Sequence, residues 1–242
     1  MIVMISPAKN MRVPEGVYSE RLPLQIDRAR ELNRLLRELS PYEWEQLLDL
    51  NPELAVRAAV NTQNWSPGGA PAALSYHGLV YHYLKAETLT PGQLAYADEH
   101  LRILSALYGP LKPLDCIRPY RLELRCGFRP DGRSLYDYWG DTYYRALEGR
   151  PILNLASGEY ASAVRPYLGR RDLMIDVDFL SYSRGRYKVI VAWAKMARGS
   201  MARFVIENRI EDPSELQHFE AVGFRYSAER SHAGKLVFLK ED

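Results

Sequence analysis

Cysteine and histidine are scarce in this sequence, and neither is arranged as a set of metal ligands. Cys116 and Cys126 are the two cysteines among 242 residues, and they lack the C-x-x-C spacing of redox and zinc sites. We interpret both as structural thiols, although the surrounding arginines could favour a reactive thiolate. His77 and His82 are five residues apart, which does not match the i, i+4 spacing of a helical metal pair. The sequence predicts no metal site and no cofactor.

Long apolar runs are also missing. No apolar stretch approaches the roughly 18 residues that a membrane-spanning helix needs. Met1–Lys9 is too short for the apolar region of a signal peptide and has no basic residues before it. We therefore expect a cytoplasmic protein without membrane contact, in which the cysteines stay reduced.

An excess of either charge is absent from the chain as a whole. The 32 basic and 30 acidic residues leave a net charge of +2, which excludes a protein coated in positive charge. Positive charge is nevertheless concentrated between Arg102 and Arg129, where six Lys and Arg residues face only Asp115 and Glu123. Nucleic-acid binding, if it occurs, would therefore depend on a local basic cleft.

The pattern of secondary structure predicts an α+β fold. Met1–Ser6 is a short apolar run typical of a buried strand, and Ser40 and Asn51, each followed by proline, mark helix starts. The order of elements is not a regular βαβ alternation, so a doubly wound sheet is not expected. We predict a single domain over residues 1–242, helix-rich in its N-terminal half and strand-rich in its C-terminal half. The predicted helices cover residues 25–39, 41–50, 52–61, 90–109, 134–147, 157–164 and 195–209, and the predicted strands cover 1–6, 151–156, 173–179, 187–192, 223–227 and 235–239.

The segment from Leu101 to Glu123 has the most informative pattern. Its leucines recur at helical spacing up to Tyr108, and Gly109-Pro110 would end that helix. Basic residues follow at Lys112, Arg118 and Arg121. A helix, a tight turn and a second basic element can hold a phosphate backbone between N–H groups and cations. The segment therefore predicts a helix-hairpin-helix-like element, although Pro110 removes one N–H donor.

Two further segments place polar residues at the ends of predicted strands, where ligands gather in α/β folds. Lys9 follows the first strand, and it could pair with a phosphate or lie on a surface loop. Asn154 and Ser157 lie at a strand-to-helix turn that could offer N–H groups to an anion. Glu159 could act as a general base beside Tyr160, or Ser157 could be an ordinary helix cap.

The predicted helix 195–209 has an apolar stripe, and Lys195 and Arg198 lie nearly opposite it, with Arg203 to one side. These cations could face a cleft or form a solvated basic face. Residues 120–123 alternate as an edge strand of a sheet would, which places Arg121 and Glu123 on one face, where they could form an ion pair that lines a pocket. Residues 136–144 contain a dense group of aromatic side chains, which we interpret as core packing rather than base stacking.

Five blocks of sequence carry a resemblance to a known family. They are MIVMISPAK (1–9), LSALYGPLKPLDCIRPYRLE (104–123), LYDYWGD (135–141), NLASGEY (154–160) and KMARGSMARFVIENR (195–209). In this order they resemble the YaaA family of bacterial peroxide stress proteins. The resemblance implies a cytosolic, single-domain protein that binds DNA through a helix-hairpin-helix-like element and limits damage when peroxide meets free iron. The chain departs from the family pattern at Asn10, where Thr or Ser is usual.

These observations give two hypotheses about function. The first is a peroxide stress protein that binds double-stranded DNA, mainly by electrostatic attraction, in a cleft formed by Lys9, Lys112, Arg118, Arg121, Lys195, Arg198 and Arg203. The alternative is an enzyme that acts on a nucleotide-like or phosphorylated small molecule in the same cleft, with Glu123, Glu159 and Tyr160 as candidate catalytic groups. An open groove would favour the first hypothesis and a closed pocket the second.

Overall fold

The computed structural model describes residues 1–17 and 20–241, which fold around one mixed β-sheet. Its strand order is β11-β12-β9-β8-β1-β5-β6, and β10 pairs with the C-terminal end of β9. The strands are β1 (Ile2–Ile5), β5 (Leu101–Ser105), β6 (Gly109–Leu111), β8 (Ile152–Asn154), β9 (Met174–Ser183), β10 (Arg186–Lys188), β11 (Phe224–Tyr226) and β12 (Lys235–Lys240). The predicted mixture of helices and strands is confirmed.

The centre of the sheet is parallel, which the sequence did not predict. β1 pairs in parallel with both β5 and β8, and the parallel arrangement continues through β9 to β12. Antiparallel pairs occur where β6, β10 and β11 join neighbouring strands, and β9 and β10, near the predicted strands 173–179 and 187–192, form a hairpin. From β1 the chain goes to β5 on one side, whereas β8 later pairs on the other side. In parallel sheets such a switch point opens a crevice at the carboxyl ends of the strands.

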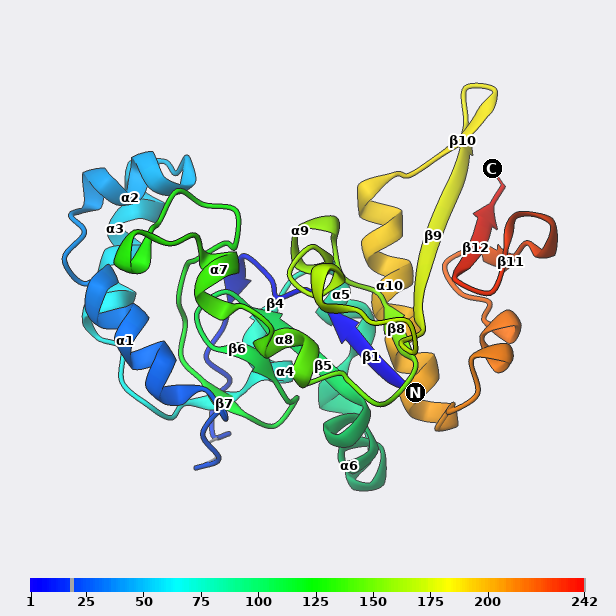
Figure 1. Cartoon of the computed structure of the whole chain (residues 1–242), viewed down its shortest axis with the longest axis horizontal. Helices are drawn as coiled ribbons and strands as arrows, with labels where there is room; N and C mark the ends of the chain where they lie inside the picture. The colour runs from blue at the N-terminus through cyan, green and yellow to red at the C-terminus, as the bar shows by residue number, and fades with distance from the viewer. Residues whose placement is uncertain (18–19, 242) are drawn as a thin grey trace.

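Helices pack around the sheet, and three of them lie together at one end of the molecule (Figure 1). Figure 1 shows α1–α3 at one end of the long axis, β9–β12 at the other, and β1, β5 and β8 between them. The helices are α1 (Ile26–Leu36), α2 (Pro41–Leu48), α3 (Pro52–Gln63), α4 (Ala72–Ser75), α5 (Leu79–Leu84), α6 (Pro91–His100), α7 (Leu135–Trp139), α8 (Thr142–Arg145), α9 (Gly158–Ala161) and α10 (Val191–Asn208). Short two-residue ladders pair β2 (Asn10–Met11) with β4 (Tyr76–His77) and β3 (Ala70–Pro71) with β7 (Cys116–Ile117). Single 3-10 turns occupy Ala86–Thr88, Pro130–Gly132, Arg165–Tyr167, Pro213–His218 and Ala228–Arg230.

The helix starts marked in the sequence are confirmed. The Ser40 hydroxyl accepts a hydrogen bond from the backbone of Glu43, whose carboxylate accepts one in return, so the predicted capping box caps α2. Asn51 caps α3, and Thr90 caps α6 in the same way. Each of these helices begins with proline. Proline lacks a backbone N–H, and this costs nothing here because an N–H at the first helical position would have no intrahelical partner.

The helix predicted up to Gly109 is wrong in its second half, because α6 ends at His100 and Leu101–Ser105 forms β5. All five residues of β5 are buried, and a short, mostly apolar run fits a central strand as well as a helix. β6 returns antiparallel to β5, so the segment is a β-hairpin and the predicted helix-hairpin-helix-like element is not formed there. Gly109 has φ +71° and lies against the ring of Trp139, a position that a side chain could not share.

Two smaller predictions also differ from the structure. The single helix predicted over 134–147 is divided at Gly140, which has φ +53°, into α7 and α8. No strand forms over 120–123, although those residues are described. The aromatic group over 136–144 does pack in the core, where Trp139 and Tyr143 are buried, so this interpretation is confirmed.

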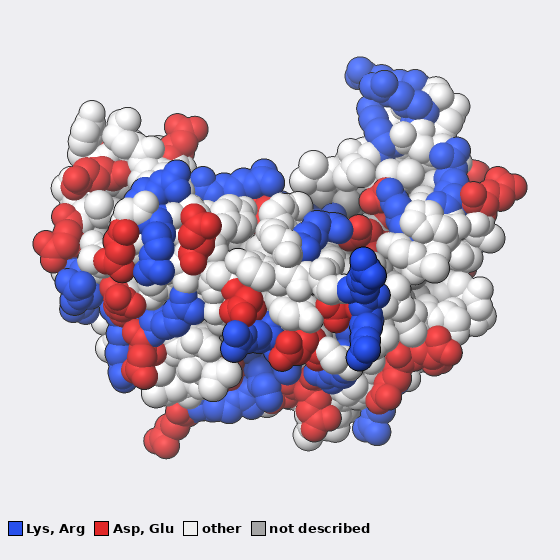
Figure 2. Space-filling view, viewed as in Figure 1, with Lys and Arg blue, Asp and Glu red and all other residues white. Residues whose placement is uncertain are grey.

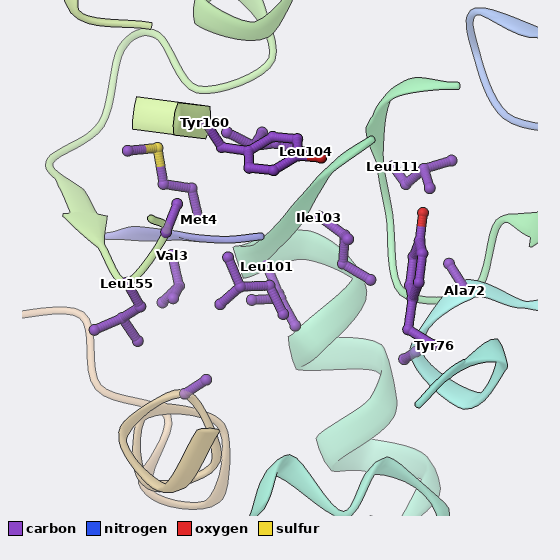
Figure 3. Close-up of a cluster of buried hydrophobic side chains, with 14 of the residues drawn as sticks. Val3, Met4, Ala72, Tyr76, Leu101, Ile103, Leu104, Leu111, Leu155 and Tyr160 are labelled. Carbon is purple, nitrogen blue, oxygen red and sulfur yellow. The ribbon is translucent and has the colours of Figure 1, made fainter. Parts of the chain in front are cut away.

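The core occupies both faces of the sheet. Figure 3 shows Val3 and Leu155 on one side of β1, and Met4 and Tyr160 on the other. All four side chains are buried. Alternate residues of β1 therefore pack into two apolar layers, which fixes the strand in the middle of the molecule and leaves its carboxyl end to shape the crevice.

Candidate functional site: a pocket at the carboxyl ends of β1 and β8

A pocket of about 500 Å³ lies at the switch point of the sheet. It begins where β1 ends at Ile5 and β8 ends at Asn154, and residues of α5 and α10 also line it. Its charged and hydroxyl-bearing lining residues are Ser6, Lys9, Tyr81, Tyr120, Arg121, Glu123, Ser157, Glu159, Tyr160, Lys195 and Arg198, and His77 also lines it. Four sequence blocks that are far apart along the chain therefore meet in one cavity.

Ser6 and Ser157 join the two strand ends. The backbone N–H of Ser157 donates to the Ser6 hydroxyl at 2.8 Å, and the Ser6 hydroxyl lies 3.2 Å from that of Ser157. The hydroxyl of Tyr81, on α5, donates to the Ser6 carbonyl at 2.9 Å. Ser157 precedes α9 but makes no side-chain cap, so its hydroxyl belongs to this junction rather than to helix capping.

Lys9, Arg121 and Glu123 form a charged cluster on one wall. The Lys9 ammonium is 2.9 Å from one oxygen of Glu123, and an Arg121 Nη is 2.9 Å from the other. The predicted ion pair between Arg121 and Glu123 is therefore confirmed. A second Nη of Arg121 donates to the Lys9 carbonyl at 3.0 Å, which holds the two segments together. One carboxylate thus serves two cations, so the cluster keeps a net positive charge.

Lys195 and Arg198, the two α10 cations that line the pocket, differ from this cluster because neither is paired in the described part of the chain. Lys195 is exposed at the pocket, and Arg198 is mostly buried there. The Nε of Arg198 is buried without a hydrogen-bond partner. Burial lowers the pKa of Arg198, although the charge of Asp178 acts in the opposite direction. A desolvated guanidinium without a carboxylate in hydrogen-bonding contact is costly, and an anionic ligand would supply the missing partner.

Close packing of α10 on α5 brings these cations to the pocket. A Cβ placed on Gly199 would lie 2.1 Å from the carbonyl oxygen of Val80 and 2.9 Å from the Cβ of Tyr83. Only glycine allows this approach of the two backbones. The predicted apolar stripe is confirmed in part, since Ala197 and Met201 are buried and Phe204 is half-buried.

Glu159 and Tyr160 lie on the opposite side of the pocket, on α9. One carboxylate oxygen of Glu159 accepts a hydrogen bond from the backbone N–H of Arg125 at 3.2 Å. Burial, with the nearby Tyr120 and Glu159, raises the pKa of Tyr160 well above its ordinary value. Tyr160 therefore stays protonated at neutral pH and can donate a hydrogen bond but cannot act as a base. Glu159 and Glu123 supply the carboxylates of the pocket.

Several residues predicted for phosphate binding have structural roles outside the pocket. Tyr108 is buried, and its hydroxyl accepts hydrogen bonds from the indole of Trp65 at 2.7 Å and from the backbone of Arg118 at 3.0 Å. Gly109 forms the turn described above. Arg118 donates to the Ser66 carbonyl at 3.1 Å, and Lys112 is exposed away from the pocket. The predicted helix-hairpin-helix-like element does not form: Tyr108 and Gly109 are buried, and Lys112 and Arg118 are exposed outside the pocket.

Arg203 also lies outside the pocket, although it is on the same helix as Lys195. Its guanidinium donates to the carbonyls of Leu84 and Lys85 at the end of α5 and to the Thr88 hydroxyl, at 3.1, 3.0 and 2.8 Å. It also pairs with Glu207 at 2.7 Å. Arg203 therefore caps the C-terminal end of α5, where unpaired carbonyls attract a cation.

Asn154 has a structural role beside the pocket. Its side-chain amide donates to Asp176 at 2.7 Å and accepts from the backbone of Ala156 at 3.0 Å. Arg165 contacts both carboxylate oxygens of Asp176, at 2.6 and 2.8 Å. This group joins β8 to β9 and holds the turn that leads to Ser157.

Replacing Asp176 by asparagine should lower stability at neutral pH but not in acid. Burial raises the pKa of Asp176, but the hydrogen bonds from Arg165 and Asn154 outweigh burial and leave it below its ordinary value. The stabilisation is therefore present above about pH 4 and is lost as pH falls through the lowered pKa. Because the pair is partly exposed, we expect a loss of about 0.5–1 kcal/mol, or roughly 1–4 °C, at pH 7. Thermal melts between pH 3 and 7 should show the difference shrinking in acid, with Asp141→Asn as an exposed control. A constant difference across this range would contradict the assignment.

Sequence reasoning missed His77 and Tyr81, which reach the pocket from β4 and α5. The region around them gave an ambiguous pattern, and no residue in it has an obvious chemical motif. Sequence reasoning also did not assign Ser6 to the site, although a hydroxyl directly after a predicted strand is a signal that could have been used.

The cysteines and the titratable clusters give no sign of a redox or metal centre in the described residues. Cys116 is buried, and burial raises the pKa of the Cys126 thiol, which opposes a reactive thiolate. Over residues 1–17 and 20–241, no group of three or more His, Cys, Asp or Glu side chains gathers as a metal site. Within the same residues, no helix has the length and apolarity needed to cross a membrane.

Comparison with known proteins identifies the family. Residues 1–230 match the family described as Peroxide stress protein YaaA. A UPF0246 protein of Ralstonia nicotianae is 41% identical, over 100% of this chain and 99% of the relative. UPF0246 proteins of Burkholderia cenocepacia and Paraburkholderia phytofirmans are 40% and 39% identical, each over 99% of this chain and 98% of the relative. The chain therefore belongs to the YaaA family of peroxide stress proteins, as its five sequence blocks predicted.

Proposed function

We propose that this protein acts in the peroxide stress response by binding a phosphorylated small molecule of nucleotide size in the pocket between β1, β8 and α10. The observation that carries the proposal is Arg198, a mostly buried guanidinium at the pocket whose Nε has no partner among the described residues. Lys195 adds a second unpaired cation on the same helix face. A phosphate group would pair with both, since arginine and lysine are the common ligands of phosphate.

The size and lining of the pocket support a small ligand. A volume of about 500 Å³ lies within the range of pockets that enclose small molecules. Leu79, Leu122 and Leu155 line it together with Tyr81 and Tyr160, which suits an apolar or aromatic group attached to the phosphate. The carboxylates of Glu123 and Glu159 lie on the same walls. Carboxylates have no use in a simple phosphate-backbone cleft, but they suit acid–base chemistry on a bound substrate.

DNA binding is the second candidate, and one surface favours it. Residues 179–206 contain six Lys and Arg residues and no Asp or Glu. Three of them, Arg184, Arg186 and Lys188, belong to the β9–β10 hairpin, which projects from the body in Figure 1. Figure 2 shows a surface that is hollowed between this hairpin and a band of Lys and Arg near α7. Positive charge on both sides of a hollow could attract a phosphate backbone with little sequence preference.

Titration of the purified chain with a mononucleotide and with a duplex of about 25 bp, across a salt series, tests both candidates. We expect Lys195→Ala to weaken mononucleotide binding about tenfold, because a charge-assisted hydrogen bond is lost. Lys112→Ala, which removes an exposed lysine outside the pocket, should leave it unchanged. Duplex binding with a steep salt slope and no mononucleotide binding would show that the DNA candidate is right and the small-molecule proposal wrong.

A further inference from the structure

A second cavity of about 450 Å³ adjoins the pocket. The two cavities share Lys9, Asn10, Tyr120 and Arg121, which form the wall between them. On its far side the second cavity is lined by one face of α3 and by the residues that follow β2.

The shared wall is held in place by several contacts. Arg121 donates to the Lys9 carbonyl at 3.0 Å, and the backbone N–H of Tyr120 approaches the sulfur of Met11 at 3.5 Å. Asn10 pairs with His77 in the β2–β4 ladder. The cations of the wall are therefore fixed at the boundary of both cavities, where one ligand could contact them from either side.

The second cavity is strongly cationic. Lys9, Arg12, Arg57 and Arg121 line it, and among the described residues no carboxylate does. Arg57 is exposed and makes no hydrogen bond or ion pair with the described residues, and the Nε of Arg121 is buried without a partner. Glu123 pairs with Lys9 and Arg121 from the side of the first pocket, so it neutralises only part of this charge.

The face of α3 is suited to receive a ligand. Leu54, Arg57, Ala58 and Asn61 follow the i, i+3, i+4, i+7 spacing of one helical face, and all four line the cavity. Ala58 is buried and small, which leaves space between the longer side chains. Leu50 and Val13 add apolar surface beside the arginines.

We infer that the second cavity is an anion subsite, and that the ligand is a linear molecule with at least two phosphate groups that spans both cavities. The inference rests on the proposed function of the first pocket. One phosphate binds at Lys195 and Arg198, the chain of the ligand passes Lys9 and Arg121, and a second phosphate is held by Arg12 and Arg57. A nucleoside polyphosphate and a short single-stranded nucleotide chain both have this chemistry.

Calorimetric titration with thymidine monophosphate, the dinucleotide pdTpdT and ATP tests the inference on the full chain. We expect pdTpdT or ATP to bind about tenfold more tightly than the monophosphate, because further charge-assisted contacts form. Arg57→Gln should remove most of this advantage and leave monophosphate affinity unchanged. Arg34→Gln, which removes an exposed arginine of α1 outside both cavities, is the matched control. A gain with pdTpdT alone identifies a nucleotide chain, and a gain with ATP alone a polyphosphate.

Equal affinity of the wild-type chain for all three probes would overturn the second subsite and leave the proposed function intact. An Arg57→Gln variant that retains the full advantage would also overturn it. Failure of every probe to bind would instead count against the proposed function itself.

Discussion

Replacing Gly199 by alanine should lower the melting temperature by about 5–10 °C. The new Cβ would lie 2.1 Å from the carbonyl oxygen of Val80 and 2.9 Å from its carbon, and neither backbone atom can rotate away. Overpacking of this kind costs about 2–3 kcal/mol, and each kcal/mol lowers the melting temperature of a chain of this size by roughly 2–4 °C. Because α10 must move away from α5, ligand affinity should fall as well.

Gly158→Ala is the matched control for this substitution. Gly158 is also helical, but no heavy atom lies within 4 Å of a Cβ placed there. Alanine is favoured over glycine in helices, so this variant should be as stable as the wild type or slightly more stable. Equal melting temperatures for Gly199→Ala and Gly158→Ala, measured by circular dichroism, would show that α10 and α5 are not packed as closely as described.

Replacing Arg198 by methionine should separate binding from stability. Methionine fills a similar space without charge, so phosphate affinity should fall by about 30-fold, which corresponds to roughly 2 kcal/mol. The free energy of unfolding should not fall and could rise by about 1 kcal/mol, because a desolvated guanidinium without a hydrogen-bond partner at Nε is removed. The melting temperature would then rise by about 2–4 °C. Calorimetry and thermal melts on the same preparation measure both effects.

Arg203→Met, on the same helix, should have the opposite effects on stability and ligand affinity. Arg203 binds the end of α5 and Glu207, so its loss should lower the melting temperature and leave ligand affinity nearly unchanged. If Arg198→Met were instead destabilising with affinity intact, Arg198 would be a structural residue and the pocket would lose its principal phosphate ligand.

Features that depend on a few adjacent residues could be predicted from the sequence. Ser40, Asn51 and Thr90 each place a hydrogen-bond acceptor before proline, and the helix start follows from that local chemistry. The β9–β10 hairpin is similar, because its polar turn at Arg184-Gly185 separates two apolar runs.

Features that depend on distant partners could not be predicted in this way. The apolar spacing of Leu101–Ser105 fits a helix or a buried strand, and only its pairing with β1 decides between them. The parallel order of the sheet is likewise a property of pairs of strands and has no signal within any one of them.

Only part of the candidate site could be predicted, because some of its residues are marked by local sequence and others depend on distant partners. Lys9 and Ser157 follow strands, and strand ends meet in a parallel sheet, so their convergence could be expected. Asn154 and Arg203 have the same chemistry as ligand-binding residues, but they contact Asp176 and the end of α5 instead. Residue type alone cannot distinguish a side chain that stabilises the fold from one that binds a ligand.

The place of β1 in the sheet has a consequence for synthesis of the chain. β1 leaves the ribosome long before its neighbours in the sheet, since Val3 pairs with Leu101 and Ile2 with Ile152. A strand that is apolar on both faces must therefore remain without β5 until residue 105 has been made, and without β8 until residue 154 has been made. Long-range parallel pairing is slow, and unpaired apolar strands are prone to aggregate. We therefore expect the growing chain to depend on chaperones until β8 emerges, and β1 to be the strand of the central sheet that is exposed to misfolding for longest.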